Sequence, residues 1–328
     1  MRGSMAEEAT GFVMSLPEKP EGSEEPKYKQ ENDFSLRLRS MRWLGRQRWI
    51  SRGGDAILRK LYDPDADRHY RFEVDFFGKR YRGDLANYID WVVFCYGGAP
   101  LSELSLLREL TVEVRRHRSG PITCYDVGAN VGHHTLFMSG VADRVIAFEP
   151  FPDVRRQLEE KISLNCLENV QVFPVALGLK DEDLRYYPGV GSNSGIGTFV
   201  ADNASQDQVS YILPVRQGNK LFAEANLPTM DILKVDVEGF EASVFGGLKQ
   251  RINHDRPAIL TEVLDASRSM MGSEAAFREC FYEGAVFAGV EGRLNSDKFI
   301  LKPFKYETAD EVVIVPPEMA EFIESRIA

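Results

Sequence analysis

The chain has 328 residues, of which 43% are hydrophobic and 27% are charged. This length can bury a sizeable core, and the composition excludes a disulfide-stapled mini-protein, a collagen and a disordered polymer. The 40 basic and 50 acidic residues give a net charge of -10, which argues against a surface that coats nucleic acid. The four cysteines and five histidines form no disulfide framework or zinc pattern, and no signal peptide or membrane-spanning apolar run is apparent. We therefore expect reduced thiols, a cytoplasmic location and no integral membrane contact.

Two segments of opposite charge come first. Residues 1–33 carry four basic and eight acidic side chains, so we expect a mobile acidic tail, and the opening MRGS is typical of an expression leader before Met5. Residues 34–60 contain eight basic residues and the single acid Asp55. Apolar side chains at helical spacing predict a basic amphipathic helix here that runs to Gly53. Such a helix suits an anionic partner, although arginines more often pair with acidic residues of their own chain.

Residues 70–83 alternate in polarity about a Gly-Lys turn and predict a hairpin, and helices are expected near residues 85–95 and 101–118. We assign residues 34–118 to an N-terminal extension that contacts the substrate or a second copy of the chain. Residues 119–328 form the main domain.

Short apolar strands alternate with amphipathic helices throughout the main domain. The strands are expected at residues 122–127, 144–148, 170–176, 232–237, 258–263, 285–290 and 311–315. The helices are expected at residues 132–139, 153–166, 241–251 and 273–283. This alternation predicts an α/β domain with a mostly parallel, doubly wound, Rossmann-like sheet. The last two strands have no helix between them and predict an antiparallel hairpin at its edge.

The turns that follow the first two strands carry the cofactor chemistry. In the first turn, Asn130 stands where the dinucleotide fingerprint GxGxxG has its second glycine, which disfavours an NAD-dependent dehydrogenase. Asp126 can bind an ammonium group, and Glu149, about twenty residues later, can accept both hydroxyls of a ribose. A nucleoside with an amino-acid tail satisfies both, so S-adenosylmethionine is the expected cofactor. The candidate cofactor-binding residues are Asp126, Gly128, Asn130, Gly132, Thr135, Glu149, Pro150, Ala176 and Asp236.

Four motifs in this order resemble the FkbM family of S-adenosylmethionine-dependent methyltransferases, over roughly residues 120–265. They are residues 126–136, the turn Phe148-Glu149-Pro150, residues 169–177, and DILKVDVEGFE at residues 231–241 followed by Gly247. The resemblance implies a Rossmann-like methyltransferase fold and, most often, O-methylation of a sugar or another natural product. Other members methylate peptide amides, so N-methylation is the alternative.

Carboxylates at the ends of the fourth and fifth strands are the candidate catalytic residues. Methyl transfer needs an aligned acceptor and, for a hydroxyl acceptor, a group that removes its proton. We favour Asp236 for this role, with Lys234 on the same strand face as its ion-pair partner, and expect Glu238 to meet the N-terminus of the next helix. Glu262 ends the fifth strand, where an apolar setting makes a carboxylate costly unless it has a partner or a function.

Several alternatives stay open around these residues. His133 and His134 begin a helix beside the cofactor and are candidate bases, acceptor contacts or neutral structural imidazoles. Asp236 and Glu262, joined by Asn219 or Glu238, are candidate Mg²⁺ ligands, although two or three carboxylates do not establish a metal site. Many family members have an acid where this chain has Asn219. A helix cap would survive that change, but a charge-dependent role would not.

Residues 177–230 are long for a crossover and rich in hydroxyl, glycine and aromatic residues, which suits either a lid that stacks on a sugar or a surface β-meander. We expect O-methylation of a small-molecule acceptor with a hydroxyl group, such as a sugar, a glycoside or another secondary metabolite. A non-catalytic module that docks on an acidic surface through residues 34–60 is the rival outside enzymology. A homo-oligomer is compatible with either.

Overall fold

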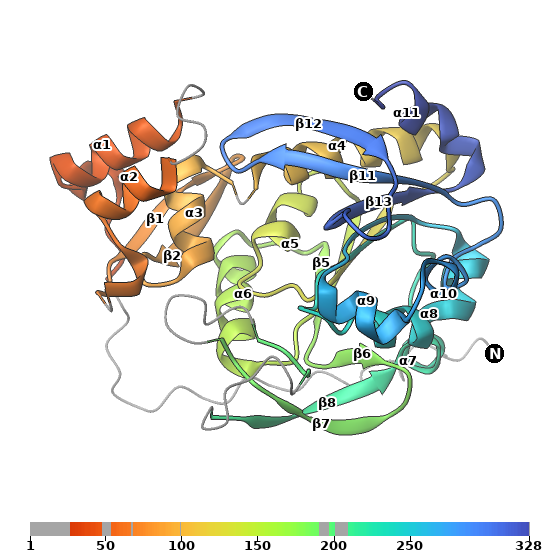
Figure 1. The fold of residues 1–328 in the computed structure, drawn as a ribbon. Helices are drawn as coiled ribbons and strands as arrows, with labels where there is room; N and C mark the ends of the chain where they lie inside the picture. Colours follow the sequence, from red (N-terminus) through yellow and green to blue (C-terminus); the bar gives the residue numbers. More distant parts are fainter. Residues whose placement is uncertain are drawn as a thin grey trace, which may run out of the picture.

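The computed structural model describes residues 27–47, 54–66, 68–98, 100–189, 197–200 and 209–327. Its centre is an eight-stranded sheet in the order β12-β11-β13-β10-β9-β3-β4-β5 (Figure 1). The strands are β3 (Thr123–Val127), β4 (Arg144–Phe148), β5 (Val170–Phe173), β9 (Ile232–Val235), β10 (Ala258–Glu262), β11 (Val286–Arg293), β12 (Ser296–Pro303) and β13 (Glu311–Val315). Strands β5, β4, β3, β9 and β10 are parallel, whereas β13 is antiparallel to both β10 and β11. The predicted sheet with its antiparallel hairpin is confirmed, and β12, which the sequence did not indicate, adds an outer edge.

Alternate side chains of each strand enter two different apolar layers, as period-2 geometry requires. Cys124 of β3 belongs to a buried cluster with α4 and α5, whereas its neighbour Tyr125 belongs to a cluster with α7 and α8 on the opposite face. These helices are α4 (Leu101–His117), α5 (His133–Met138), α7 (Gly218–Glu224) and α8 (Glu241–Asp255). Helices therefore cover both faces of the sheet, and the residues that end its strands are sorted between the same two faces.

A second sheet comes from the long segment between β5 and β9. It has the order β6-β8-β7 and contains β6 (Ala176–Gly178), β7 (Glu182–Tyr186) and β8 (Tyr211–Gln217). The strand predicted over residues 170–176 is therefore wrong in extent, because it divides into β5 and β6 around Pro174. Proline lacks the backbone N–H that a sheet ladder needs, so the chain leaves the first sheet there.

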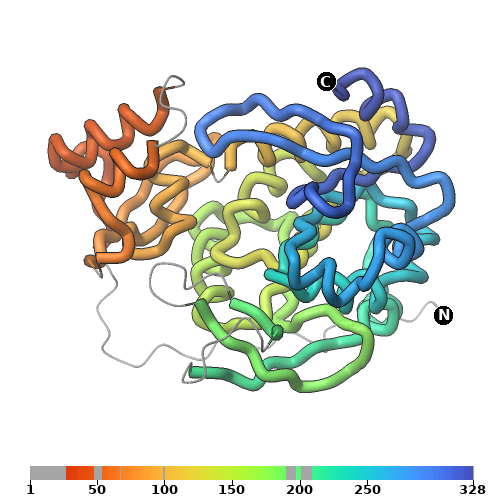
Figure 2. The backbone as a smooth tube through the Cα atoms, viewed as in Figure 1, coloured from red at the N-terminus to blue at the C-terminus, as the bar shows by residue number. Residues whose placement is uncertain are grey.

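The N-terminal extension packs beside the main sheet, and Figure 2 shows it in red and orange at the left of the view. It contains α1 (Leu36–Gly45), α2 (Gly54–Leu61), β1 (Arg71–Phe76), β2 (Lys79–Asp84) and α3 (Tyr88–Tyr96). The predicted hairpin and both following helices are confirmed. The basic helix ends at Gly45 rather than Gly53, and residues 48–53 lie outside the described residues. Of the predicted tail, residues 1–26 also lie outside them, whereas Lys29 pairs with Phe72 of β1.

Several arginines of the basic segment bind groups of their own chain. Arg42 is buried, donates to the Phe94 carbonyl at 3.0 Å and pairs with Glu31. Arg59 pairs with two aspartates just after α2. Trp43, by contrast, is 60% exposed.

Four more helices complete the domain: α6 (Pro152–Leu164), α9 (Asp265–Met271), α10 (Glu274–Arg278) and α11 (Ala320–Glu324). Of these, α6 packs Leu158 against Ala147 of β4. In the part of the chain that the structure describes, no helix combines the length and the apolar character needed to cross a membrane.

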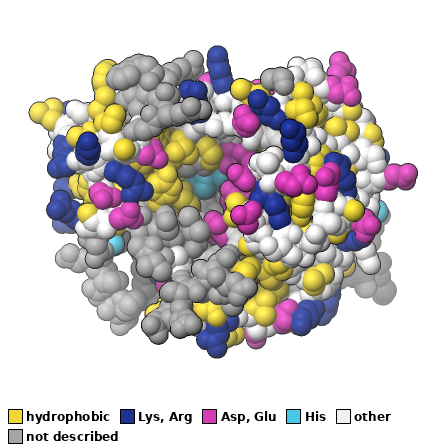
Figure 3. Space-filling model, in the orientation of Figure 1, with side chains coloured by type: hydrophobic (Ala, Val, Ile, Leu, Met, Phe, Trp, Pro, Cys, Tyr) yellow, Lys and Arg dark blue, Asp and Glu magenta, His cyan; other side chains and the backbone are white. Residues whose placement is uncertain are grey.

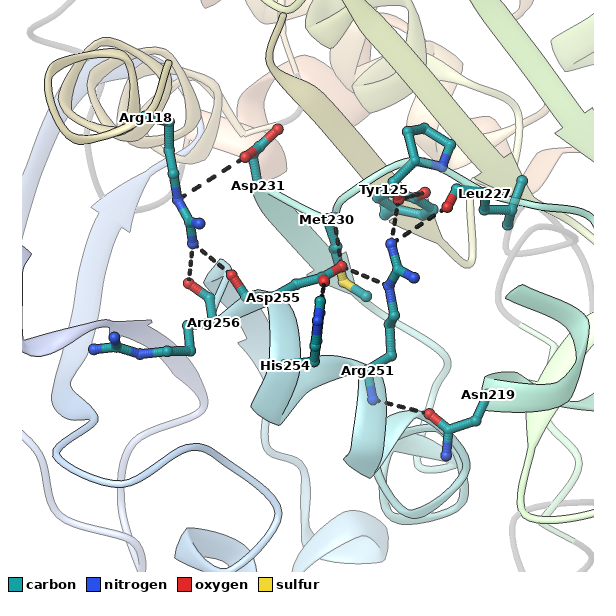
Figure 4. A network of polar contacts seen from close by, with 11 residues as sticks. Arg118, Tyr125, Asn219, Leu227, Met230, Asp231, Arg251, His254, Asp255 and Arg256 are labelled. Carbon is teal, nitrogen blue, oxygen red and sulfur yellow. Dashed lines mark hydrogen bonds and ion pairs between the residues drawn. The ribbon is translucent and has the colours of Figure 1, made fainter. Parts of the chain in front are cut away.

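A polar network joins elements at the amino ends of the central strands (Figure 4). Its centre is the buried Asp255, which accepts hydrogen bonds from the Met230 amide at 2.7 Å and Arg251 Nε at 2.6 Å. Arg118, just after α4, donates to the backbone carbonyls of Asp255 and Arg256. The network thereby fastens the ends of α4 and α8 to the segment that enters β9.

Candidate active site

The turn between β3 and α5 brings two strand ends into close contact. Gly128 and Gly132 have φ angles of +83° and +89°, which favour glycine. A Cβ on Gly128 would lie 1.8 Å from the Asp236 carbonyl oxygen, and one on Gly132 would lie 2.4 Å from Leu158 Cδ1. Asn130 also has a positive φ, of 53°, which asparagine tolerates better than most residues. The turn therefore depends on glycine both for its backbone angles and for room.

Glu149, just after β4, connects this turn to the next one. Its two carboxylate oxygens accept hydrogen bonds from the backbone N–H groups of Asn130 and Phe151, each at 2.9 Å. The residue is buried, and burial raises the pKa of Glu149 to about 7. Each oxygen keeps a second lone pair, which a ribose hydroxyl can use.

A small pocket lies over the two turns. Its lining is Val127, Gly128, Asn130, Phe148, Glu149, Pro150, Ala176, Leu177, Tyr186, Gly197, Phe199, Asp236, Val237, Glu238 and Phe240. The pocket has a volume of about 50 Å³, room for a few water molecules rather than for a nucleoside. Tyr186 and Phe199 pack edge-on, with ring centroids 5.2 Å apart. A nucleoside therefore needs these aromatic rings to move.

Three of the candidate cofactor residues lie outside this lining. Asp126 is fully buried, accepts a hydrogen bond from Thr135 Oγ1 at 2.6 Å, and lies 3.9 Å from Lys234 Nζ. Gly132 packs on α6. The ammonium group beside Asp126 in this structure is thus that of Lys234, and contact between Asp126 and an amino-acid tail stays a prediction.

A much larger cleft, of about 1820 Å³, opens on the face of the sheet that α4 covers. Ser105 and Glu109 of α4 line it together with long stretches of β11 and β12, and Glu262 and Glu311 also contribute. In the space-filling view, the molecule is hollowed near its centre, with histidine deep in the hollow and acidic side chains along one rim (Figure 3).

Three carboxylates stand in a row where β9 and β10 end and the antiparallel β13 begins, and we name them the acidic row: Asp236, Glu262 and Glu311. Glu262 and Glu311 are direct partners in the antiparallel register of β10 and β13. The parallel register of β9 and β10 pairs Thr261 with Val235, so Asp236 follows at the level of Glu262. Neighbouring strands lie about 4.8 Å apart, so the three carboxylates share one small region. Asp236 lines the small pocket and the other two line the cleft, so the row joins the two spaces.

Lys234 lies beneath the acidic row, as its predicted pairing with Asp236 requires. Its Nζ is 3.0 Å from Asp236 Oδ2, and the side chain is 2% exposed. Burial alone would lower the pKa of Lys234, but the carboxylates around it raise that pKa overall. The charge of Asp236, followed by burial, raises the pKa of Glu262 to about 9, and burial raises that of Glu311. At neutral pH, Lys234 is charged and Glu262 holds its proton.

Both candidate histidines are buried at the start of α5. Burial holds the pKa of His133 and of His134 well below the usual range, so both rings are neutral. His134 Nε2 lies 3.1 Å from Glu103 Oε1 of α4, and His133 Nδ1 has no hydrogen-bond partner among the described residues. Glu103 and Glu311 were not predicted as site residues. Glu103 shares its helix with Glu109 and Glu113, and Glu311 directly follows Asp310, so neither acid stands out in the sequence.

The predictions that Glu238 meets the next helix and that Asn219 joins Asp236 in a metal site are wrong. Glu238 lines the small pocket, whereas Glu241 accepts the backbone N–H groups of Val237 and Gly239 at the start of α8, because α8 begins three residues later than Glu238. Asn219 cannot join a metal site with Asp236, because it accepts the Arg251 amide in the polar network at the opposite end of the strands (Figure 4). Within the described ranges, no three His, Cys, Asp or Glu side chains are grouped so as to hold a metal ion.

Comparison with known proteins adds independent findings. A family model described as a methyltransferase FkbM domain matches residues 126–288. Methyltransferase 1 of Beauveria bassiana is 30% identical over 143 residues, which are 38% of this chain and 57% of that protein. The hexuronic acid methyltransferase AglP of Haloferax volcanii is 29% identical over 126 residues, 38% of this chain and 48% of that protein. The AMB antimetabolite synthetase AmbE of Pseudomonas aeruginosa is 27% identical over 175 residues, 43% of this chain and 8% of that protein.

The chain thus spans at most 57% of the length of these relatives. Among solved structures, a methyltransferase FkbM from Methylobacillus flagellatus aligns with a TM-score of 0.39 and 14% identity, over 60% of this chain and 43% of that one.

Proposed function

Since the chain belongs to the FkbM family of methyltransferases, we propose that it transfers the methyl group of S-adenosylmethionine to a hydroxyl group of a sugar, a glycoside or another secondary metabolite. The observation that carries this proposal is the position of the acidic row between the small pocket and the large cleft. A donor over the two turns and an acceptor in the cleft would meet at Asp236. The four cysteines are free thiols, which is consistent with a reaction in the cytoplasm.

The residue types that line the small pocket suit an adenosyl group, which needs the Tyr186 and Phe199 rings to move. Gly128 lets the β3 turn lie against the Asp236 backbone where any Cβ would collide, and Glu149 offers one free lone pair on each oxygen to the ribose hydroxyls. The aromatic rings of Phe148, Tyr186 and Phe199 suit a flat base. Bound S-adenosylmethionine would supply an electrophilic methyl group.

The protein's part in the reaction is to align the acceptor and to take its proton. Asp236 is 29% exposed and reaches the junction of the two spaces, so its carboxylate is the group we assign to accept the hydroxyl proton. Lys234 holds that carboxylate in place at 3.0 Å. Without a bound cation, Glu262 keeps its proton at neutral pH, and a positive charge on the acceptor would favour its carboxylate form. Exclusion of water from such a site favours direct attack on the methyl carbon.

A hydroxyl of a sugar is the acceptor that we favour, because the relative AglP is named for hexuronic acid methylation. The size of the cleft, about 1820 Å³, leaves room for acceptors larger than one sugar ring. N-methylation of a peptide amide is the alternative that product analysis must exclude.

Isothermal titration with S-adenosylhomocysteine tests the donor half of the proposal. We expect saturable binding, which Glu149→Ala weakens about ten- to hundred-fold because two charge-assisted contacts are removed. Glu318→Gln, a change of one surface carboxylate that pairs with Arg256, is the matched control and should bind normally. Absence of binding by the unmodified protein would refute the assignment. Mass spectrometry of products from a panel of sugars and peptides then separates O-methylation from N-methylation.

A further inference from the structure

Among the described residues, the site holds more carboxyl groups than cationic side chains. Asp126 and the acidic row lie around Lys234, and Glu103 approaches from α4. The charge of Lys234 stabilises Asp236 and Asp126. Among the described residues, Glu262 and Glu311 have no ion-pair partner. Carboxyl groups that are enclosed in this way are costly unless they are protonated or meet a cation that the protein does not supply.

Unpartnered polar atoms point to a ligand in the same place. Glu311 Oε1 and His133 Nδ1 are buried and accept or donate no hydrogen bond within the described part of the chain. His133 itself is 6% exposed and lies within electrostatic range of Glu103 and Asp236. Buried polar atoms are nearly always paired in folded proteins, so two unpaired atoms, one in the acidic row and one near Asp236, indicate a group that binds there.

The spacing of the carboxyl groups favours an ammonium group over a metal ion. A divalent ion needs several oxygen ligands within about 2.0–2.6 Å of one point. No three acidic, histidine or cysteine side chains of the described residues converge in that way. An ammonium group accepts longer contacts, of about 2.8 Å, from carboxylates on two neighbouring strands.

We propose that the acceptor of this enzyme carries a protonated amine, and that Glu262 and Glu311 bind this ammonium group while the hydroxyl to be methylated faces Asp236. The inference rests on the proposed function and names its substrate class: amino sugars, amino alcohols and similar amine-bearing hydroxyl compounds. Glu311 lies outside residues 126–288, which the FkbM domain model matches.

Matched pairs of acceptors that differ in one charged group test the proposal. Serinol and glycerol form one pair, and glucosamine and glucose form another, since in each an ammonium group replaces a hydroxyl. The full chain is titrated with each compound in the presence of saturating S-adenosylhomocysteine. Methyl transfer from radiolabelled S-adenosylmethionine is measured in parallel. We expect each amine to bind about ten-fold or more tightly than its neutral partner.

The variants Glu262→Gln and Glu311→Gln should reduce that preference to about two-fold or less without changing the affinity for S-adenosylhomocysteine. Glu318→Gln, far from the cleft, should keep the full preference. Because glutamine preserves the size of glutamate and removes only its ability to carry a charge, these variants test charge rather than packing, and circular dichroism checks that they are folded.

Three results would overturn the inference. The first is equal or weaker binding of the amines, including no binding of any compound while S-adenosylhomocysteine still binds. The second is a preference for amines that survives in both glutamine variants. The third is a loss of affinity for S-adenosylmethionine alone, which would show that the acidic row serves the cofactor's sulfonium. Failure to bind S-adenosylhomocysteine would instead contradict the proposed function itself.

Discussion

The two ends of the central sheet use the same residue types in opposite ways. At the amino ends, Asp255 accepts hydrogen bonds from the Met230 amide and Arg251, and Arg118 closes the network over backbone carbonyls (Figure 4). At the carboxyl ends, the carboxylates outnumber their partners. The buried side-chain atoms that lack a hydrogen bond among the described residues all lie at this end: Asp126 Oδ1, His133 Nδ1, Glu311 Oε1 and His134 Nε2, whose approach to Glu103 lacks hydrogen-bond geometry.

This difference separates residues that hold the fold together from residues available to a ligand. A satisfied buried network rigidifies the elements that it joins, whereas an unsatisfied one costs stability and is kept where function needs it. Substitutions at the amino ends should therefore act on stability, and substitutions at the carboxyl ends on binding and turnover.

The largest expected effect is on catalysis at the carboxyl ends. Asp236→Asn removes the group that we assign to take the hydroxyl proton, so kcat should fall about 10²- to 10⁴-fold. Affinity for S-adenosylhomocysteine should stay within a few-fold, since the pocket keeps its shape. Turnover with an identified acceptor and titration of the product together check this. A normal kcat would remove Asp236 from the reaction.

The counterpart at the amino ends is Asp255→Ala. It leaves the buried Met230 amide and the Arg251 guanidinium without their shared acceptor, so the free energy of unfolding should fall by about 3 kcal/mol. Activity per folded molecule should not change. Urea denaturation measures the first quantity, and turnover at low temperature measures the second. Lost activity in the folded variant would contradict the division between the two ends.

Two glycine-to-alanine variants separate the effect of a steric clash from the effect of backbone strain alone. Gly128→Ala places a Cβ against the Asp236 carbonyl oxygen, and Gly120→Ala, at a φ of +95°, meets nothing within 4 Å. Both should lose about 1 kcal/mol of stability through the left-handed backbone, and Gly128→Ala should lose more because its Cβ also collides with a backbone oxygen. Only Gly128→Ala should also weaken S-adenosylhomocysteine binding, by about ten-fold or more, because the turn must shift. Equal binding by the two variants would exclude that contact as a determinant of the pocket.

The smallest effect is on the pH dependence of stability. Glu262 has a pKa of about 9 in the folded protein and 4.5 as its ordinary value, so the folded state holds a proton that the unfolded chain releases. Stability from this group is complete below about pH 4.5 and is lost as the pH rises towards 9. Glu262→Gln should therefore raise Tm by a few degrees at pH 8.5 and leave it nearly unchanged at pH 4.5. Calorimetry at the two pH values would contradict this if the Tm difference were the same at both.

Much of the catalytic end was predictable from the sequence because strand ends in a parallel sheet share one edge. That rule places Gly128, Glu149, Asp236 and Glu262 around one region from the sequence alone. It could not find Glu103 or Glu311, since a helix and an antiparallel strand bring their residues to the site through tertiary packing. The division at Pro174 and the strand β12 were missed because both depend on pairing between distant segments.

The position of β13 imposes an order on how this site comes into being. The ribosome delivers β13 after β10 and β11, yet in the sheet β13 lies between them. A nascent chain that lacks β13 has no partner to join β10 to β11, so the long-range pairing that completes the sheet must come late. Glu311 is the first residue of that strand. The acidic row is therefore complete only after Glu311 has been synthesised, and a chain that lacks β13 carries the turns at Gly128 and Glu149 without the third carboxylate.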